Sequence, residues 1–189
     1  IYPIGYFGCP RQNDFTSEPT HKILRVIDDI PHIKELGCNA VYFGPVFESS
    51  AHGYDTADYT KIDRRLGTNE DFKKVCDALH ENGIRVVLDG VFNHVGRDFW
   101  AFRDVRENKL GSAKKDWSEL VKLNLYNPEV KQYLKDCITG WKNEFGIDGL
   151  RLDVAYCLDL NFLKELHGHC KWLAEDFFLL GETLHGDYN

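Results

Sequence analysis

The stretch that decides the fold is Gly149-Leu150-Arg151-Leu152-Asp153-Val154. It is dominated by apolar residues and preceded by Gly146, a pattern typical of a short buried strand. Because side chains alternate between the two faces of a strand, Arg151 and Asp153 share one face and the apolar residues share the other. An arginine and an aspartate inside a protein are costly unless they satisfy each other or meet a ligand. Taken alone, such a pair is more often structural than functional.

Predicted strands and helices alternate along the chain around this stretch. The segment 1–7 is a candidate first strand, although Pro3 places it near a strand start or edge. The other strands are predicted at 39–43, 84–88, 149–154 and 177–180, the helices at 23–36, 69–82, 128–145 and 161–173, and long loops at 44–67 and 91–127. Nearly apolar strands joined by helices predict a parallel sheet covered by helices. Both a doubly wound sheet and a (β/α) barrel fit this order, and the nucleotide-binding fingerprints are missing from the sequence.

Composition narrows the class of protein. The chain has 189 residues, of which 43% are hydrophobic and 28% charged, and this composition suits one globular domain. Its net charge of −7 disfavours nucleic acid or an anionic membrane as a partner. No apolar run approaches the ~20 residues of a membrane span. Six cysteines without metal-type spacing predict reduced thiols and a cytoplasmic location, with secretion as the alternative. The lack of methionine predicts a piece of a longer protein.

Three predicted strands end in acids, namely Asp89, Asp153 and Glu182, and His94 follows closely on the first. In parallel α/β folds, ligands collect at the carboxyl ends of the strands. If the strands bearing Asp153 and Glu182 are neighbours, their backbones lie about 4.8 Å apart. That spacing fits the carboxyl separation of about 5–5.5 Å in retaining glycosidases. Double displacement therefore follows if the chemistry is glycosidic, a condition that spacing alone does not establish.

Five segments resemble motifs of the α-amylase superfamily of glycoside hydrolases, glycoside hydrolase family 13. Residues 89–94 (DGVFNH), 149–155 (GLRLDVA) and 181–185 (GETLH) resemble its first three signature motifs, in order and on the expected strand ends. Residues 52–59 (HGYDTADY) resemble the loop after the second barrel strand in the neopullulanase, maltogenic amylase and oligo-glucosidase branches of the family. Residues 120–124 (LVKLN) are similar to the extra motif of the neopullulanase branch, so the chain most resembles the neopullulanase, maltogenic amylase and cyclomaltodextrinase branch. The resemblance covers essentially the whole chain. It implies a (β/α)8 TIM barrel, of which residues 1–189 would supply about the first five β/α units.

The resemblance also implies roles for the strand-end residues. Asp153 would be the nucleophile that forms a glycosyl-enzyme, and Glu182 the general acid/base. Arg151 would keep Asp153 ionised and oriented. Because Glu182 must be protonated for the first step, its pKa should lie well above that of Asp153.

Further residues would bind the sugar. By the same resemblance, His94 would donate to a sugar hydroxyl, Tyr54 would stack on the sugar face, and Asp55 would accept hydroxyl hydrogens. Asp89 would either brace Arg151 or touch substrate. Asn93 binds calcium in some relatives, but without identifiable further ligands we predict no cofactor, with calcium as the lesser alternative. No His/Cys/acid set has metal spacing.

The sequence departs from the family pattern near its end. The fourth motif, a His-Asp pair, should lie beyond residue 189; residues 185–187 (HGD) have the wrong spacing, and the linker 111–119 is short for the family. Strands six to eight would also be missing, so we expect the isolated chain to be inactive, with an open edge that favours a homo-oligomer or requires a C-terminal half.

Two function classes remain. The first is a hydrolase or transglycosylase of maltodextrin, pullulan or cyclodextrin type α-glucans, and the second is a non-catalytic relative that serves as an interaction or carbohydrate-binding module. Non-catalytic relatives typically lose the nucleophile or the acid. Because both Asp153 and Glu182 are present with Arg151 and His94, the enzyme is favoured.

Overall fold

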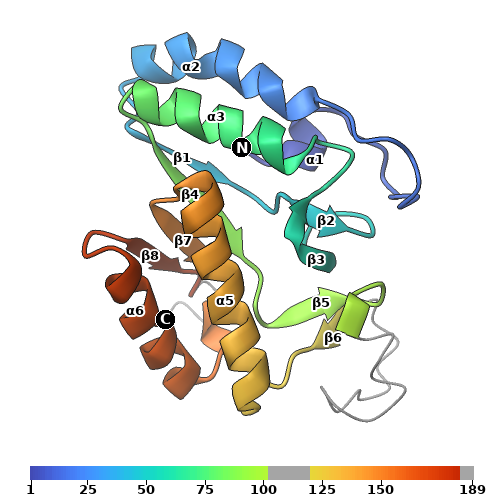
Figure 1. Cartoon of the computed structure of the whole chain (residues 1–189), viewed down its shortest axis with the longest axis vertical. Helices are drawn as coiled ribbons and strands as arrows, with labels where there is room; N and C mark the ends of the chain where they lie inside the picture. The colour runs from blue at the N-terminus through green and yellow to red at the C-terminus, as the bar shows by residue number, and fades with distance from the viewer. Residues whose placement is uncertain (102–119, 184–189) are drawn as a thin grey trace, which may run out of the picture.

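A four-stranded parallel sheet forms the centre of the computed structural model, which describes residues 1–101 and 120–183 (Figure 1). Its strands are β1 (Ala40–Phe43), β4 (Arg85–Gly90), β7 (Gly149–Leu152) and β8 (Phe178–Gly181), in the spatial order β1-β4-β7-β8. Spatial order therefore follows chain order, as in a barrel, whereas a doubly wound sheet reverses direction at its switch point. The four strands do not close into a barrel within the described residues.

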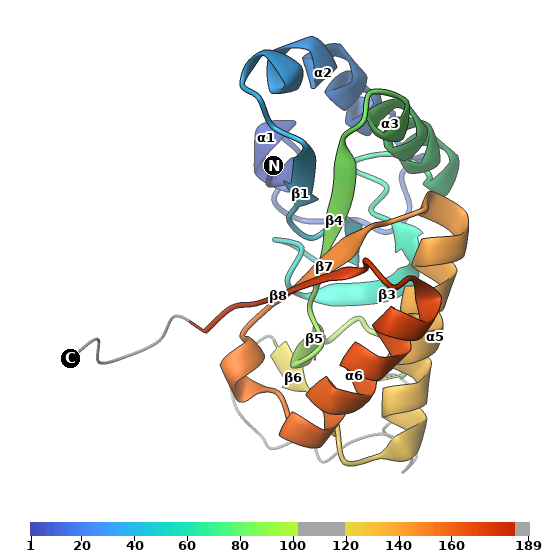
Figure 2. The same cartoon turned by 90° about the vertical axis from the view of Figure 1, so that its left-hand side faces the viewer.

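Helices connect these strands, and α3, α5 and α6 lie along one face of the sheet (Figure 2). Beyond residue 20, the helical segments of the described residues are η1 (Lys22–Arg25), α2 (Val26–Glu35), α3 (Asn69–Glu81), α5 (Pro128–Phe145), η2 (Ala155–Cys157) and α6 (Leu160–Leu173). In the described ranges, no helix has the length and apolarity needed to cross a membrane.

Local chemistry sets the helix ends. The Thr68 hydroxyl accepts a hydrogen bond from the Asp71 backbone N–H, and the Asp71 carboxylate accepts one from the Thr68 N–H, which completes a capping box at the start of α3. The Asn127 side chain caps α5, which Gly146 ends in a left-handed conformation at φ 72°. The predicted starts of α3 and α5 are confirmed.

The first predicted strand is wrong over most of its length. Residues Pro3–Tyr6 form the short helix α1, because Pro3 has no N–H for a strand ladder and its fixed φ suits the first turn of a helix. Ile1 alone extends the sheet: its amino group donates to Tyr42 O at 2.7 Å and its carbonyl accepts from Gly44 N at 2.7 Å. This is the bonding pattern of one parallel bridge beside β1.

Two antiparallel hairpins occupy segments that were predicted as loops. β2 (Phe47–Ser49) pairs with β3 (Thr56–Ile62), and β5 (His94–Gly96) pairs with β6 (Leu120–Lys122). β2, β5 and β6 have three residues each, which is too short to give a periodic hydrophobic signal. β3 has seven residues, but its burial does not alternate regularly along the strand, so the period-two pattern of a strand is missing there. The expectations for 111–119 and 185–187 lie outside the described residues.

An aromatic cluster joins α5 to the first hairpin. The rings of Phe47 and Trp141 stack with centroids 4.4 Å apart, and Phe92 stacks on the same indole at 6.1 Å. Trp141 Nε1 also donates a hydrogen bond of 2.8 Å to the carbonyl of Tyr59. All four side chains are buried, so the hairpin and α5 share one core.

Candidate active site

The predicted acids lie at the carboxyl ends of three adjacent strands. Asp89 is next to last in β4, Asp153 follows β7, and Glu182 follows β8. Asp89 is in register with Arg151 across β4 and β7, so their side chains project from the same face of the sheet.

Arg151 holds the three carboxylates together. Its Nη1 lies 2.9 and 3.1 Å from the two oxygens of Asp89 and 2.9 Å from Asp153 Oδ1. Its Nη2 lies 2.8 Å from Glu182 Oε2. Asp153 and Glu182 therefore contact the two terminal nitrogens of one guanidinium, and they face the same side of the sheet. Asp89 braces Arg151, as one of the two sequence-based alternatives proposed.

Burial has the largest influence on the pKa values of Asp153 and Asp89. It raises the pKa of Asp153, which is 6% exposed, although hydrogen bonding and charge from Arg151 oppose the shift. Burial likewise raises the pKa of Asp89, which is 3% exposed, against hydrogen bonds from Tyr42 and Arg151. Burial also opposes the charge of Arg151, but the hydrogen bond and charge of Asp89 raise the pKa of this guanidinium. Arg151 thus orients Asp153 without giving it a low pKa.

Glu182 has a second partner in the backbone. The N–H of Val154 donates a hydrogen bond of 2.8 Å to Glu182 Oε2. Val154 has φ 40° and ψ 47°, a left-handed conformation that is rare for a β-branched residue. This turn, directly after Asp153, brings the chain at the end of β7 into contact with the residue that follows β8.

Tyr42 is a site residue that the sequence analysis missed. Its hydroxyl donates a hydrogen bond to Asp89 Oδ2. Along β1, Val41 and Phe43 are buried whereas Ala40 and Tyr42 are exposed, so Tyr42 lies on the face away from the core. The only available signal was a hydroxyl-bearing residue in an otherwise apolar strand.

The loop between β2 and β3 brings Tyr54 and Asp55 to the site. Burial, followed by the charge of Asp89, raises the pKa of Tyr54 to about 12, and a hydrogen bond with Tyr42 acts in the opposite direction. Asp55 Oδ1 accepts hydrogen bonds of 3.0 Å from the N–H groups of His52 and Gly53. Asp55 therefore shapes its own loop in addition to any contact with a sugar.

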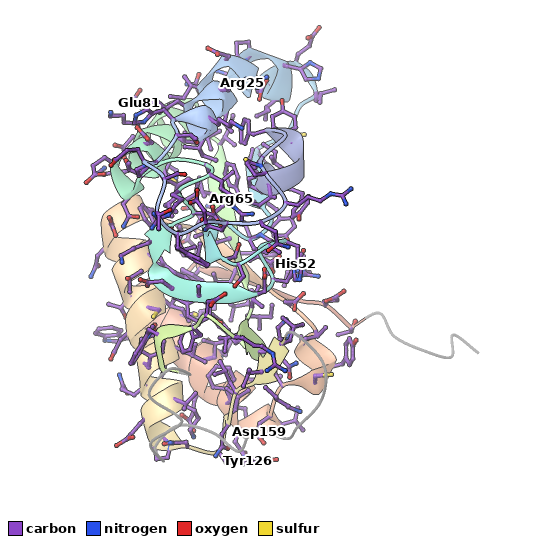
Figure 3. The ribbon with its side chains drawn as sticks, turned by 90° about the vertical axis from the view of Figure 1, so that its right-hand side faces the viewer. Arg25, His52, Arg65, Glu81, Tyr126 and Asp159 are labelled. Atoms are coloured by element: carbon purple, nitrogen blue, oxygen red, sulfur yellow. The ribbon has the colours of Figure 1, made fainter. Side chains whose placement is uncertain are left out.

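Arg65 anchors this loop from behind, and the sequence analysis did not identify it. The guanidinium is buried and pairs with Asp63 at 2.7 Å, while Nη1 donates to Ala51 O at 2.7 Å and Nη2 to Ser49 Oγ at 2.9 Å. Figure 3 shows Arg65 and His52 in the same part of the molecule, around the β2–β3 hairpin. The loop that bears Tyr54 is therefore tied to a buried ion pair.

His94 and Asn93 carry buried polar atoms that lack hydrogen-bond partners in the part of the chain that the structure describes. These atoms are His94 Nε2 and Asn93 Oδ1. His94 Nε2 lies 4.0 Å from Asp153 Oδ2, and burial lowers the pKa of His94 against the opposing charge of Asp153. Buried polar atoms are normally bonded, so a ligand hydroxyl near Asp153 would satisfy the imidazole.

The candidate calcium ligand that the sequence offered is Asn93. Calcium takes roughly six to eight oxygen ligands, and Asn93 Oδ1 offers one. Within residues 1–101 and 120–183, no group of three or more His, Cys, Asp and Glu residues could hold a metal ion. The absence of a cofactor stays a prediction.

Comparisons with known proteins agree on one family. The model of the alpha amylase catalytic domain matches residues 22–119 and 114–189. A cyclomaltodextrinase of Geobacillus thermopakistaniensis is 40% identical, covering 85% of this chain and 31% of the relative, and neopullulanase 2 of Thermoactinomyces vulgaris is 41% identical with the same coverage. The chain thus spans about a third of the length of these relatives.

A solved structure supports the same assignment. The ligand-free cyclic alpha-maltosyl-(1→6)-maltose hydrolase from Arthrobacter globiformis superposes with a TM-score of 0.81 at 34% identity, covering 93% of this chain and 46% of that one. The four parallel strands therefore correspond to part of a TIM barrel. The chain belongs to the α-amylase catalytic-domain family of glycoside hydrolases.

Proposed function

We propose that the protein is a retaining α-glucan hydrolase in which Asp153 is the nucleophile and Glu182 the general acid/base. The observation that carries this proposal is the shared guanidinium: Arg151 contacts Asp153 and Glu182 from two nitrogens, at the ends of the neighbouring strands β7 and β8. Neighbouring strands lie about 4.8 Å apart, which favours the close carboxyl pair of a double displacement.

In the first step, an oxygen of Asp153 bonds to the anomeric carbon while the glycosidic C–O bond breaks. Glu182 gives its proton to the leaving oxygen, and the product is a covalent glycosyl-enzyme. In the second step, Glu182 takes a proton from water, the water oxygen bonds to the anomeric carbon, and Asp153 leaves. Arg151 Nη2 contacts Glu182 Oε2 at 2.8 Å, so this contact has to open before Glu182 can reach the leaving oxygen.

The proposed substrate is an α-glucan oligosaccharide of maltodextrin, pullulan or cyclodextrin type. Relatives named cyclomaltodextrinase, maltogenic alpha-amylase and neopullulanase support this class. Tyr54 would stack on the sugar ring in the cleaved subsite, and His94 and Asp55 would bond its hydroxyl groups. The unpartnered Nε2 of His94 supports that role.

We also propose that residues 1–189 alone do not hydrolyse glucans. A closed barrel of this family has eight parallel strands, and the sheet of the described residues has four. The side chains of Phe178 and Leu180 on β8 are about half exposed, which supports covering by further protein, either another part of the same polypeptide or a second copy.

Six free cysteines and a relative named intracellular maltogenic amylase from Bacillus subtilis support a cytoplasmic location.

The experiment compares full-length gene products on an aryl α-maltoside. Asp153→Asn should lower kcat/KM by about 10³-fold, because the nucleophile loses its charge. Glu81→Gln is the control, since Glu81 lies at the far end of α3 from the site (Figure 3). Nuclear magnetic resonance should show the α-anomer of the released sugar first. Initial release of the β-anomer would contradict retention, and an active Asp153→Asn variant would contradict the role of Asp153 as nucleophile. An unsubstituted full-length protein without activity would favour the non-catalytic alternative.

A further inference from the structure

We infer that the hydroxyl of Tyr42 is a positioning group for the proposed nucleophile, acting through Asp89 and Arg151. This inference rests on the proposed function of Asp153. It adds a residue of β1 to a site otherwise built from β4, β7, β8 and the two hairpins.

The first step is the contact between Tyr42 and Asp89. The phenol donates to Asp89 Oδ2, and Asp89 Oδ1 and Oδ2 both contact Arg151 Nη1, at 2.9 and 3.1 Å. Asp89 is buried, so each donor to its carboxylate replaces water that the site excludes. Tyr42 and Arg151 are its hydrogen-bond donors among the described residues.

The second step is the sharing of one nitrogen. Arg151 Nη1, which holds Asp89, also contacts Asp153 Oδ1 at 2.9 Å. A carboxylate that loses one donor relies more on the other, so without the phenol the guanidinium should move toward Asp89. Its contact with Asp153 should then weaken, and the nucleophile should lose its alignment.

The third step concerns charge. Asp153 faces Asp89 from β4, His94 from β5, Arg151 from β7, and Glu182 after β8, and the aromatic hydroxyls of Tyr42 and Tyr54 lie near the same group of charges. Asp89 and Asp153 are like charges on one cation, and the charge of Asp153 contributes to the raised pKa of Asp89. The phenol stabilises the doubly ionised form of this pair. Without the Tyr42 hydroxyl, a higher pH should therefore be needed to ionise both Asp89 and Asp153.

Tyr42→Phe in the full-length protein tests the inference, with an aryl α-maltoside as substrate. We expect kcat to fall about tenfold, because the nucleophile loses its alignment. KM should change by a smaller factor, which reflects the hydrogen bond that Tyr54 loses. The acidic limb of the kcat/KM profile should move to higher pH. Tyr6→Phe is the matched control, because the Tyr6 hydroxyl also donates to an aspartate, Asp29 at 2.8 Å, but on helix α1.

A double-mutant cycle separates this role from general damage. If Tyr42 acts through Asp89, Tyr42→Phe should have little further effect in an Asp89→Asn background. Unchanged kinetics, a change in KM alone, or additive effects in the cycle would each overturn the inference. If Asp89→Asn does not fold, the pH profile of Tyr42→Phe decides by itself. The proposed function fails separately, through an active Asp153→Asn variant.

Discussion

Arg151 Nη2 and Glu182 Oε2 lie 2.8 Å apart, so the cation that orients the proposed nucleophile also holds the proposed acid. The N–H of Val154 contacts the same oxygen. Both donors occupy Glu182 Oε2, whereas the proposed first step needs this carboxyl group at the leaving oxygen. Under the proposed mechanism, Glu182 therefore has to leave these two donors before it can reach the leaving group.

Replacing Glu182 should have an effect that depends on the leaving group. Glu182→Gln removes the proton donor, so kcat/KM for maltosides with alkyl leaving groups should fall by about 10²–10⁴-fold. For a dinitrophenyl leaving group, which departs without protonation, glycosyl transfer to the enzyme should be much less affected, as seen in a burst of released phenol. Equal losses on both substrates would argue against a role as general acid.

Gly96 should tolerate no side chain. A Cβ there would lie 2.4 Å from the carbonyl oxygen of Asp55, in the loop that also bears Tyr54. Gly96→Ala should destabilise the protein by about 1–3 kcal/mol and weaken binding of maltooligosaccharides. Gly140→Ala in α5 is the control, because its Cβ would meet no atom within 4 Å. It should stabilise by about 0.5–1 kcal/mol, as measured by chemical denaturation.

At Val154, glycine should be more stable than alanine. The residue has φ 40°, where an L side chain is strained and glycine is not. We expect Val154→Gly to exceed Val154→Ala by about 0.5–1 kcal/mol in free energy of unfolding. The order should reverse at Lys164, an exposed position inside α6, where alanine is favoured. Alanine being the more stable residue at Val154 would mean that the left-handed turn is not populated.

Thiol chemistry should distinguish buried from exposed cysteines. Burial raises the pKa of Cys137 to about 11 and that of Cys170 to about 12, and it raises the pKa of Cys76 as well. Cys38 and Cys157 are exposed. At pH 8, iodoacetamide should therefore label the two exposed thiols first, and the three buried ones only after unfolding. Peptide mass spectrometry identifies each site, and rapid labelling of Cys76 in the native protein would contradict this core.

The sequence predicted elements whose signals are local. The capping box at Thr68, the proline that opens α5 and the apolar runs of β4 and β7 each act through neighbouring residues, so periodicity and cap chemistry sufficed. At the N-terminus, Pro3 was a local signal for a helix, because a residue without an N–H suits the first turn of a helix better than a strand.

Some residues of the candidate site could likewise be predicted from local sequence signals, and others could not. Period-two alternation placed Arg151 and Asp153 on one face, and strand ends placed Asp89 and Glu182. Tyr42 depends on the neighbour relation between β1 and β4, and the contact of Val154 with Glu182 depends on one unusual φ angle. Neither of these is encoded in spacing along the chain, so both required the three-dimensional arrangement.

The stacking of Phe47 on Trp141 bears on the entropy of sugar binding. Through this stack and the hydrogen bond from Trp141 Nε1 to Tyr59 O, helix α5 holds both strands of the hairpin whose loop carries Tyr54. At this loop, the loss of conformational entropy on binding would therefore fall more on the ligand than on the protein.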